Sequence, residues 1–206
     1  IVGTVTGTKV LHNGQKITVS CAEGEAGKVY EGLVPFSINR TNLAKLPKTK
    51  TKIMMNLGEP GQAFTIANLP NDGIGLAREE FIIANTIKVH PMALLQFGKI
   101  KDAEAKVKIK ELTVGYTHKP DFFVDKLAQG VAVLGAAFYP KDVIVRLSDF
   151  KSNEYAGLLG GKQFEPTEDN PMIGWRGASR YYDPLYIEAF KLECQALKRV
   201  RNEFGL

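Results

Sequence analysis

The sequence contains little cysteine and no long apolar run. Its 206 residues include two cysteines, Cys21 and Cys194, which lie far apart and form no CxxC pair. This spacing excludes a disulfide-stapled miniprotein and a zinc ribbon. No apolar run is long enough to cross a bilayer, and the first residues have no signal-peptide pattern. We therefore expect a cytoplasmic protein with no membrane partner, in which both cysteines are small buried apolar residues.

The common motifs of nucleotide-binding and hydrolytic enzymes are also missing. The sequence has no GxxxxGK phosphate loop and no dinucleotide-binding glycine fingerprint. It has no Ser-His-Asp pattern, and His12, His90 and His118 form no cluster and have no metal-ligand spacing. We expect none of these histidines to be catalytic and no metal site within this sequence.

The charge balance is mildly basic. Lysine and arginine outnumber aspartate and glutamate by 27 to 22, which gives a formal net charge of +5. This balance suits a phosphate-bearing ligand or a nucleic acid, but a mixed, solvated surface produces it equally well. Much of the excess lies in two lysine-rich stretches, namely Lys45, Lys48, Lys50 and Lys52, and Lys99, Lys101, Lys106, Lys108 and Lys110. Charge alone therefore leaves the partner open.

The first part of the chain differs in pattern from the rest. Residues 1–36 are predicted to form β structure, with a hairpin at Asn13-Gly14 between strands at 10–12 and 17–19. The polar, lysine-rich stretch at 39–51 is typical of a linker.

Beyond the linker, short apolar runs alternate with helical periodicity. Strands are expected at 52–57, 74–77 and 142–145, and helices at 62–69, 79–89, 121–137 and 187–204. Buried strands joined by helices predict an α/β fold with a parallel sheet. The chain is short for a complete (β/α)8 barrel, which needs about 250 residues.

The last helix has the clearest apolar face. Its members recur at three- and four-residue spacing and are Ile187, Phe190, Cys194, Leu197, Val200 and Phe204. This pattern predicts that Cys194 is buried.

Two of the predicted strands run directly into an arginine. The strand at 74–77 is followed by Arg78, and the strand at 142–145 is followed by Arg146. Ligands meet parallel sheets at the carboxyl ends of the strands, where an arginine can hold phosphate or carboxylate with two hydrogen bonds. The alternative is that each arginine only pairs with neighbours such as Glu79, Glu80 or Asp149.

A third basic segment is the loop at 170–181. Gly174 and Gly177 allow close approach of the backbone to a ligand, and Arg176 and Arg180 supply positive charge. Trp175 either stacks on a ligand or anchors the loop in the core. A structural arginine-rich turn explains the same residues.

These three segments, 73–81, 143–151 and 170–181, resemble the phosphoenolpyruvate-utilising enzymes. The run Arg146–Tyr155 is most similar to the members that make phosphoenolpyruvate from pyruvate, ATP and water. Residues 18–24 are similar to the end of the phosphohistidine domain of that family. The resemblance covers essentially the whole chain.

The resemblance implies a fold, a reaction and roles for three residues. Residues 1–38 would be the β-rich end of a swivelling phosphohistidine domain, 39–51 the linker, and 52–206 the N-terminal part of a (β/α)8 TIM-type barrel. The reaction converts ATP, pyruvate and water to AMP, phosphoenolpyruvate and phosphate through a phosphohistidine, with Mg²⁺ as cofactor and ATP as co-substrate. Arg78, Arg146 and Arg176 would bind pyruvate or phosphoenolpyruvate and the transferring phosphoryl group.

The resemblance also indicates what this piece lacks. The phosphohistidine would precede Ile1, and the metal-binding Glu and Asp and the acid/base Cys would follow Leu206, so no catalytic residue is assigned and neither cysteine takes that role. We expect no activity from the piece alone, a homo-oligomer, and the phosphohistidine domain as the internal partner. The alternatives are a relative of pyruvate phosphate dikinase or of phosphotransferase enzyme I, and a non-catalytic binding or assembly module. Nucleic acid is not the expected partner.

Overall fold

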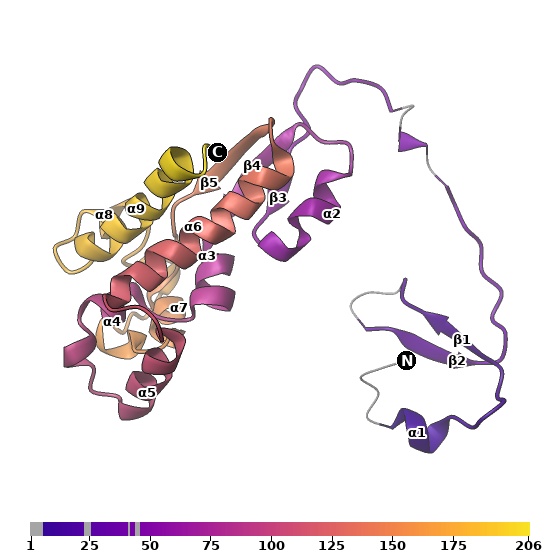
Figure 1. The fold of residues 1–206 in the computed structure, drawn as a ribbon, viewed down its shortest axis with the longest axis horizontal. Helices are drawn as coiled ribbons and strands as arrows, with labels where there is room; N and C mark the ends of the chain where they lie inside the picture. The colour runs from indigo at the N-terminus through magenta and orange to yellow at the C-terminus, as the bar shows by residue number, and fades with distance from the viewer. Residues whose placement is uncertain (1–5, 23–25, 41, 44–45) are drawn as a thin grey trace. The chain divides into compact units, whose positions relative to one another are not determined.

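The chain consists of two compact units, Ile1–Leu46 and Pro47–Leu206. A computed structural model describes residues 6–22, 26–40, 42–43 and 46–206 (Figure 1). The β structure predicted for residues 1–5 and 23–25 lies outside the described residues.

The described residues of the first unit form one short α-helix and one two-stranded sheet. Helix α1 spans Gly7–Val10, and strands β1, Ile17–Ser20, and β2, Lys28–Glu31, pair antiparallel. The predicted hairpin at Asn13-Gly14 is wrong. The turn forms, with Gly14 at φ 82° and the Gln15 backbone N–H donating to the His12 carbonyl at 3.1 Å, but helix α1 extends to Val10 and residues 11–12 belong to no strand. Strand β1 therefore pairs with the segment that follows it in the chain.

The second unit is built on a parallel sheet with strand order β3-β4-β5. The strands are β3, Met55–Leu57, β4, Gly73–Arg78, and β5, Asp142–Arg146, and both pairings are parallel. This confirms the predicted α/β fold with a parallel sheet. Within the described residues the three strands form an open sheet and no closed barrel. Gly73 is required where β4 meets β5, because its φ is 122° and a Cβ atom there would lie 2.2 Å from the Asp142 carbonyl oxygen.

Helices and single turns connect and cover the strands (Figure 1). Their bounds are η2 Pro60–Gln62, α2 Ala63–Ala67, α3 Glu79–Ile82, η3 Ile83–Ile87, α4 Pro91–Leu95, η4 Phe97–Lys99, α5 Ala103–Leu112, α6 Lys119–Phe138, α7 Ser152–Gly157, η5 Gly161–Gln163, η6 Pro171–Ile173, α8 Ala178–Tyr181 and α9 Ile187–Glu203. The helix predicted at 79–89 is divided, because α3 widens into a π-helical turn that ends at Lys88 with φ 62°. No helix in the described part of the chain is both long and apolar enough to cross a membrane.

Helix α6 anchors the sheet to the rest of the unit. Near its C-terminus, Leu134 and Phe138 pack with Ile74 and Ala77 of β4 in one apolar cluster. Its N-terminal half enters the larger core formed with α3, η3, α4 and α9. Burial of each large apolar side chain stabilises the fold by about 1.5–3 kcal/mol, so this helix fixes the position of the strand ends.

Helix α9 forms where the periodicity predicts it but buries a different face. Its buried residues are Ala189, Leu192, Glu193, Ala196 and Val200. Cys194 is exposed, and so is Cys21, so the predicted burial of both cysteines is wrong. The small residues Ala189 and Ala196 let the helix lie close to α6, and this rotates the larger Phe190 and Leu197 to the edge of the core.

Candidate functional site

The two arginines predicted at strand ends lie side by side at one edge of the sheet. Arg78 is the last residue of β4 and Arg146 the last of β5, and the two residues are partners in the strand register. Together with Arg176 they line a hollow of about 570 Å³. The other residues of its wall are Glu80, Phe81, Ala84, Asn85, Asp149, Phe150, Lys151, Glu154 and Met172. We call this space the arginine hollow.

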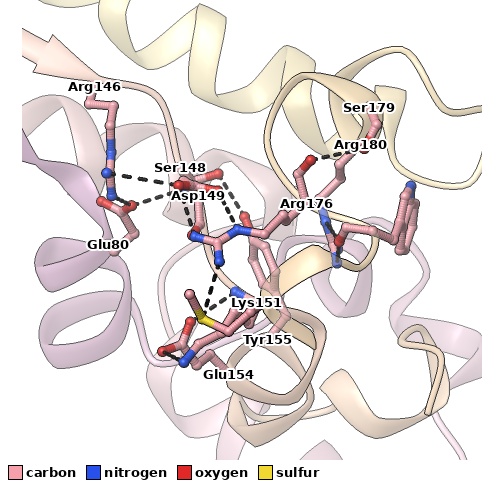
Figure 2. A network of polar contacts seen from close by, with 12 residues as sticks. Glu80, Arg146, Ser148, Asp149, Lys151, Glu154, Tyr155, Arg176, Ser179 and Arg180 are labelled. Atoms are coloured by element: carbon pink, nitrogen blue, oxygen red, sulfur yellow. Dashed lines mark hydrogen bonds and ion pairs between the residues drawn. The ribbon is translucent and has the colours of Figure 1, made fainter. Parts of the chain in front are cut away.

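Two carboxylates hold Arg146, a residue of the wall of the arginine hollow (Figure 2). Its Nη2 pairs with Glu80 Oε1, and its Nη1 lies 3.8 Å from Asp149 Oδ2. The side chain of Glu80 is only 11% exposed, whereas that of Arg146 is 40% exposed. Glu80 Oε1 also accepts a hydrogen bond of 3.0 Å from the Asp149 amide, so one carboxylate fixes both the arginine and the turn after β5.

Arg176 reaches the same turn from the other side (Figure 2). Its Nε and Nη2 donate to Asp149 Oδ1 and Oδ2, each at 2.9 Å, and Nη2 also donates to the Asp149 carbonyl at 3.2 Å. The hydrogen bond from Arg176 lowers the pKa of Asp149 against the opposing effect of partial burial, so Asp149 is a carboxylate at neutral pH. The two-pronged contact fixes the plane of the Arg176 guanidinium.

Arg78 differs from the other two arginines because it is exposed and unpaired. No described residue forms a hydrogen bond or an ion pair with its guanidinium, although β4 fixes its backbone beside Arg146. An arginine without an internal partner keeps all five N–H donors for a ligand.

The wall of the arginine hollow carries one more positive than negative group. Four cationic side chains, Arg78, Arg146, Lys151 and Arg176, face three carboxylates, Glu80, Asp149 and Glu154. Lys151 Nζ lies 3.3 Å from Glu154 Oε1, so each of the three carboxylates already has a cationic partner. Because guanidinium groups bind phosphate and carboxylate in the same planar manner, a small anion with two or three charges can join or replace these internal partners.

The loop that presents Arg176 is clamped from inside by Arg180. This side chain is buried and forms two hydrogen bonds to Glu165, at 2.6 and 2.7 Å. Its Nη2 also donates to the Trp175 carbonyl at 2.9 Å, and its guanidinium carbon lies 4.0 Å from the centre of the Trp175 ring. Arg180 therefore lies in the core, and Trp175 anchors the loop.

Two residues of the arginine hollow were missed by the sequence analysis. Asn85 lies in the π-helical turn η3 and donates to Glu59 at 3.3 Å. Lys151 follows Arg146 in the same run of sequence and lies just before α7. The position of Lys151 five residues after a strand end could have indicated it, but the widened turn that brings Asn85 to the wall has no sequence pattern of its own.

Neither His90 nor His118, the two histidines of the second unit, lines the arginine hollow. His90 is fully buried; its Nδ1 accepts a hydrogen bond from the Met92 amide at 3.1 Å, and its Nε2 lies 2.9 Å from Glu165 Oε1. His12 and His118 are exposed. No group of three His, Cys, Asp or Glu side chains in the described ranges could hold one metal ion. The Mg²⁺ that the resemblance implies has no ligands assigned among these residues.

Comparison with known proteins identifies the class to which this site belongs. A family model described as "PEP-utilising enzyme, PEP-binding domain" matches residues 37–206. The match covers most of the chain, so the chain belongs to the family of phosphoenolpyruvate-utilising enzymes. This confirms the resemblance of the three arginine segments.

The individual relatives are phosphoenolpyruvate synthases. The synthase of Synechocystis sp. is 60% identical over 207 residues, that of Deinococcus radiodurans 57% over 206, and that of Escherichia coli 50% over 206. Each alignment covers 100% of this chain but only 25%, 26% and 26% of the relative, respectively. The chain thus spans about a quarter of the length of the curated relatives it matches.

Proposed function

We propose that this chain is the part of a phosphoenolpyruvate synthase that binds phosphoenolpyruvate and pyruvate. The complete reaction would convert ATP, pyruvate and water to AMP, phosphoenolpyruvate and phosphate through a phosphohistidine. The observation that carries the proposal is the convergence of Arg78, Arg146 and Arg176 on one hollow at the carboxyl edge of a parallel sheet.

The charges of the arginine hollow suit the ligand. Phosphoenolpyruvate carries a carboxylate and a phosphate, and both are planar or forked acceptors for guanidinium groups. Arg78 would make the first contact because it has no described internal partner. Arg146 and Arg176 would then exchange part of their contacts with Glu80 and Asp149 for contacts with the phosphoryl group.

The same arrangement supports phosphoryl transfer. Such transfer depends on positioning and on stabilising the charge that spreads over the phosphoryl oxygens, rather than on protein-derived bonds. Guanidinium groups already fixed by Glu80 and Asp149 need little rearrangement when that charge develops. The proposal assigns binding and charge stabilisation to the three arginines and assigns no catalytic acid or base to this chain.

The domain assignment is part of the proposal. Residues 1–38 would be the end of a phosphohistidine domain, 39–51 the linker, and 52–206 the first strands and helices of a (β/α)8 barrel. The two-unit division and the open parallel sheet support this assignment. The Mg²⁺ and the ATP-binding residues would belong to other parts of such an enzyme, and the phosphohistidine domain would be the internal partner.

Titration calorimetry of the chain with phosphoenolpyruvate tests the proposed function. We expect one binding event that Arg176→Ala weakens at least tenfold, since it removes a charge-assisted, two-pronged contact. Arg201→Ala removes the same charge from an exposed position on α9 and should leave the affinity unchanged. Equal losses in the two variants, or no binding to the wild-type chain, would contradict the proposal.

Two alternatives give different results in simple assays. A relative of pyruvate phosphate dikinase would release pyrophosphate rather than phosphate, so the products of the full-length enzyme distinguish it. A binding or assembly module that uses the lysine stretches would bind an acidic polymer with a steep salt dependence. The proposal predicts phosphate release and no such binding.

The same proposal predicts the localisation and the oligomeric state of the protein. We expect a cytoplasmic enzyme that forms a homo-oligomer, which analytical ultracentrifugation of the full-length protein would test. We also expect the chain alone to turn over no ATP with pyruvate, and AMP formation by the chain alone would contradict this.

A further inference from the structure

Two buried glutamates lie behind the arginine hollow, outside the wall that a ligand would contact. Glu79 follows Arg78 directly and is 1% exposed, and Glu193 of α9 is completely buried. Unpaired charges are costly inside a protein, so each carboxyl group must be neutral or fully hydrogen-bonded. The two carboxyl groups differ in how many hydrogen-bond donors surround them.

Glu193 is surrounded by hydrogen-bond donors. Its Oε2 accepts from the Ser148 amide at 3.2 Å, its Oε1 accepts from the Ser148 hydroxyl at 2.6 Å, and the Tyr186 hydroxyl oxygen lies 3.3 Å from Oε1. The backbone amide can only donate, so Glu193 must present an acceptor to it. The arrangement fits a carboxylate and would oppose an amide or hydroxyl donor at Oε2.

The hydroxyl groups around Glu193 form a chain with one direction. Tyr186 OH lies 2.5 Å from Tyr155 OH, and Tyr155 OH lies 2.7 Å from Ser148 Oγ. Because Ser148 uses its only hydroxyl proton toward Glu193, it accepts from Tyr155, which in turn accepts from Tyr186. The chain of donors therefore ends at Glu193 as the charged acceptor.

Glu79 has the opposite environment. Neither of its buried oxygens forms a hydrogen bond with a described residue. Burial, followed by the neighbouring negative charge of Glu193, raises the pKa of Glu79 well above its ordinary value. Burial also raises the pKa of Glu193, but the hydrogen bonds from Ser148 oppose that effect.

We propose that Glu193 is a positioning residue of the arginine hollow and that Glu79, buried without a hydrogen-bond partner among the described residues, is a neutral carboxylic acid. Glu193 of α9 holds the turn after β5 through Ser148, the residue before Asp149. Since Asp149 holds Arg176, the contact from Glu193 to Ser148 sets where that arginine points. Glu193 thus acts on the ligand through other residues and touches none of its atoms.

Two substitutions of the same size test this inference, which rests on the proposed function. Glu79→Gln replaces one neutral group with another, so the midpoint of thermal unfolding should not change and the affinity for phosphoenolpyruvate should stay within about twofold of wild type. Glu193→Gln places an amide donor against the Ser148 amide or removes the charged acceptor. It should weaken phosphoenolpyruvate binding about tenfold or more, as expected when binding groups are misplaced.

A destabilised control separates positioning from general loss of structure. Ile109→Ala opens the core at α5, away from the arginine hollow, and should lower the unfolding midpoint without changing the affinity of the folded fraction. Equal behaviour of Glu79→Gln and Glu193→Gln overturns the proton assignment. A Glu193→Gln variant that binds like wild type overturns the positioning role.

The failure of the inference can be distinguished from the failure of the proposed function. If the wild-type chain binds no phosphoenolpyruvate, the proposed function and the positioning role both fall. The unfolding midpoints of the two glutamine variants still decide which glutamate holds the proton. A loss of binding confined to Glu193→Gln supports both proposals.

Discussion

Arg176 and Arg180 lie four residues apart, at the end of a loop and in the short helix α8 that follows it, but they belong to two different regions of the molecule. Arg176 lines the arginine hollow and pairs with the partly exposed Asp149. Arg180 lies in a buried cluster with Glu165 and His90, where its guanidinium is 4.5 and 4.9 Å from the ring centres of Tyr155 and Tyr186. Both arginines make two-pronged contacts with a carboxylate.

The difference between the regions is the cost of breaking those contacts. At the edge of the arginine hollow, water or a ligand anion can replace Asp149. The ion pair therefore orients the Arg176 guanidinium but costs little free energy to break when a ligand binds. In the buried cluster nothing can replace Glu165, and separating the pair leaves an uncompensated charge. The first kind of contact suits binding, and the second kind suits the support of a binding loop.

The largest effect is expected from breaking the buried cluster. Arg180→Ala leaves Glu165 buried opposite His90, and we expect the free energy of unfolding to fall by about 3–5 kcal/mol. Urea unfolding followed by circular dichroism measures this change. Arg201→Ala, which removes an exposed arginine, should change the same quantity by no more than about 0.5 kcal/mol. A loss below about 1 kcal/mol for Arg180→Ala would show that the cluster is not a clamp.

The next effect concerns the rate of the full-length enzyme. Arg146→Lys keeps the positive charge but loses the planar fork that holds Glu80 and faces the arginine hollow. We expect kcat/KM to fall roughly a hundredfold, because transferred charge is stabilised by fixed donors. Steady-state kinetics with pyruvate and ATP measure this change, and Arg201→Lys serves as the control. An unchanged kcat/KM would contradict a role for Arg146 in the reaction.

Arg78 should affect binding without affecting stability. Because it pairs with no described residue, Arg78→Ala should leave the free energy of unfolding within about 0.5 kcal/mol of wild type. The affinity of the chain for phosphoenolpyruvate should fall roughly tenfold, the contribution of one charge-assisted contact. Calorimetry and urea unfolding of the same preparation give both numbers. A large loss of stability would mean that Arg78 is structural.

The smallest expected effect is the response of the buried cluster to pH. Burial lowers the pKa of His90 from its ordinary value, and its Nδ1 is occupied as an acceptor, so the folded protein holds the neutral ring. The unfolded chain takes up a proton below about pH 6.5, and the folded chain does not. The free energy of unfolding is therefore highest above that pH, and it falls below that pH by at most about 1.4 kcal/mol per pH unit.

Urea unfolding between pH 8 and pH 5 measures this slope. The exposed His118 offers a matched control, since His118→Gln should keep the slope that His90 produces. A folded protein whose His90 ring takes up a proton near pH 6.5, followed by NMR of the ring carbons, would contradict the prediction.

The sequence predicts the parts of the fold that depend on neighbouring residues. The strands ending at Arg78 and Arg146 were predicted because an apolar run that stops at a charged residue marks a buried strand end. Parallel strands then bring both ends to one edge, so the convergence of these arginines follows from the fold class. The hairpin at Asn13-Gly14 failed because a turn pattern does not specify which segments pair.

Contacts between distant segments could not be predicted in the same way. Glu80 and Arg146 are 66 residues apart, and Asp149 and Arg176 are 27 apart, so no spacing in the sequence indicates their pairing. The burial of Glu193 and the exposure of Cys194 were missed for a related reason. Periodicity finds the helix, but the face that is buried depends on how closely the small residues of α9 let it pack on α6.

A crystal structure of the chain with bound phosphoenolpyruvate tests the central claim most directly. We expect the phosphate group in the arginine hollow, with guanidinium nitrogens of Arg78, Arg146 and Arg176 about 2.7–3.0 Å from its oxygens. At least one of the contacts to Glu80 or Asp149 should be lengthened, while the contacts between Arg180 and Glu165 stay unchanged. Phosphoenolpyruvate bound elsewhere, or bound with all three arginines uninvolved, would contradict the account.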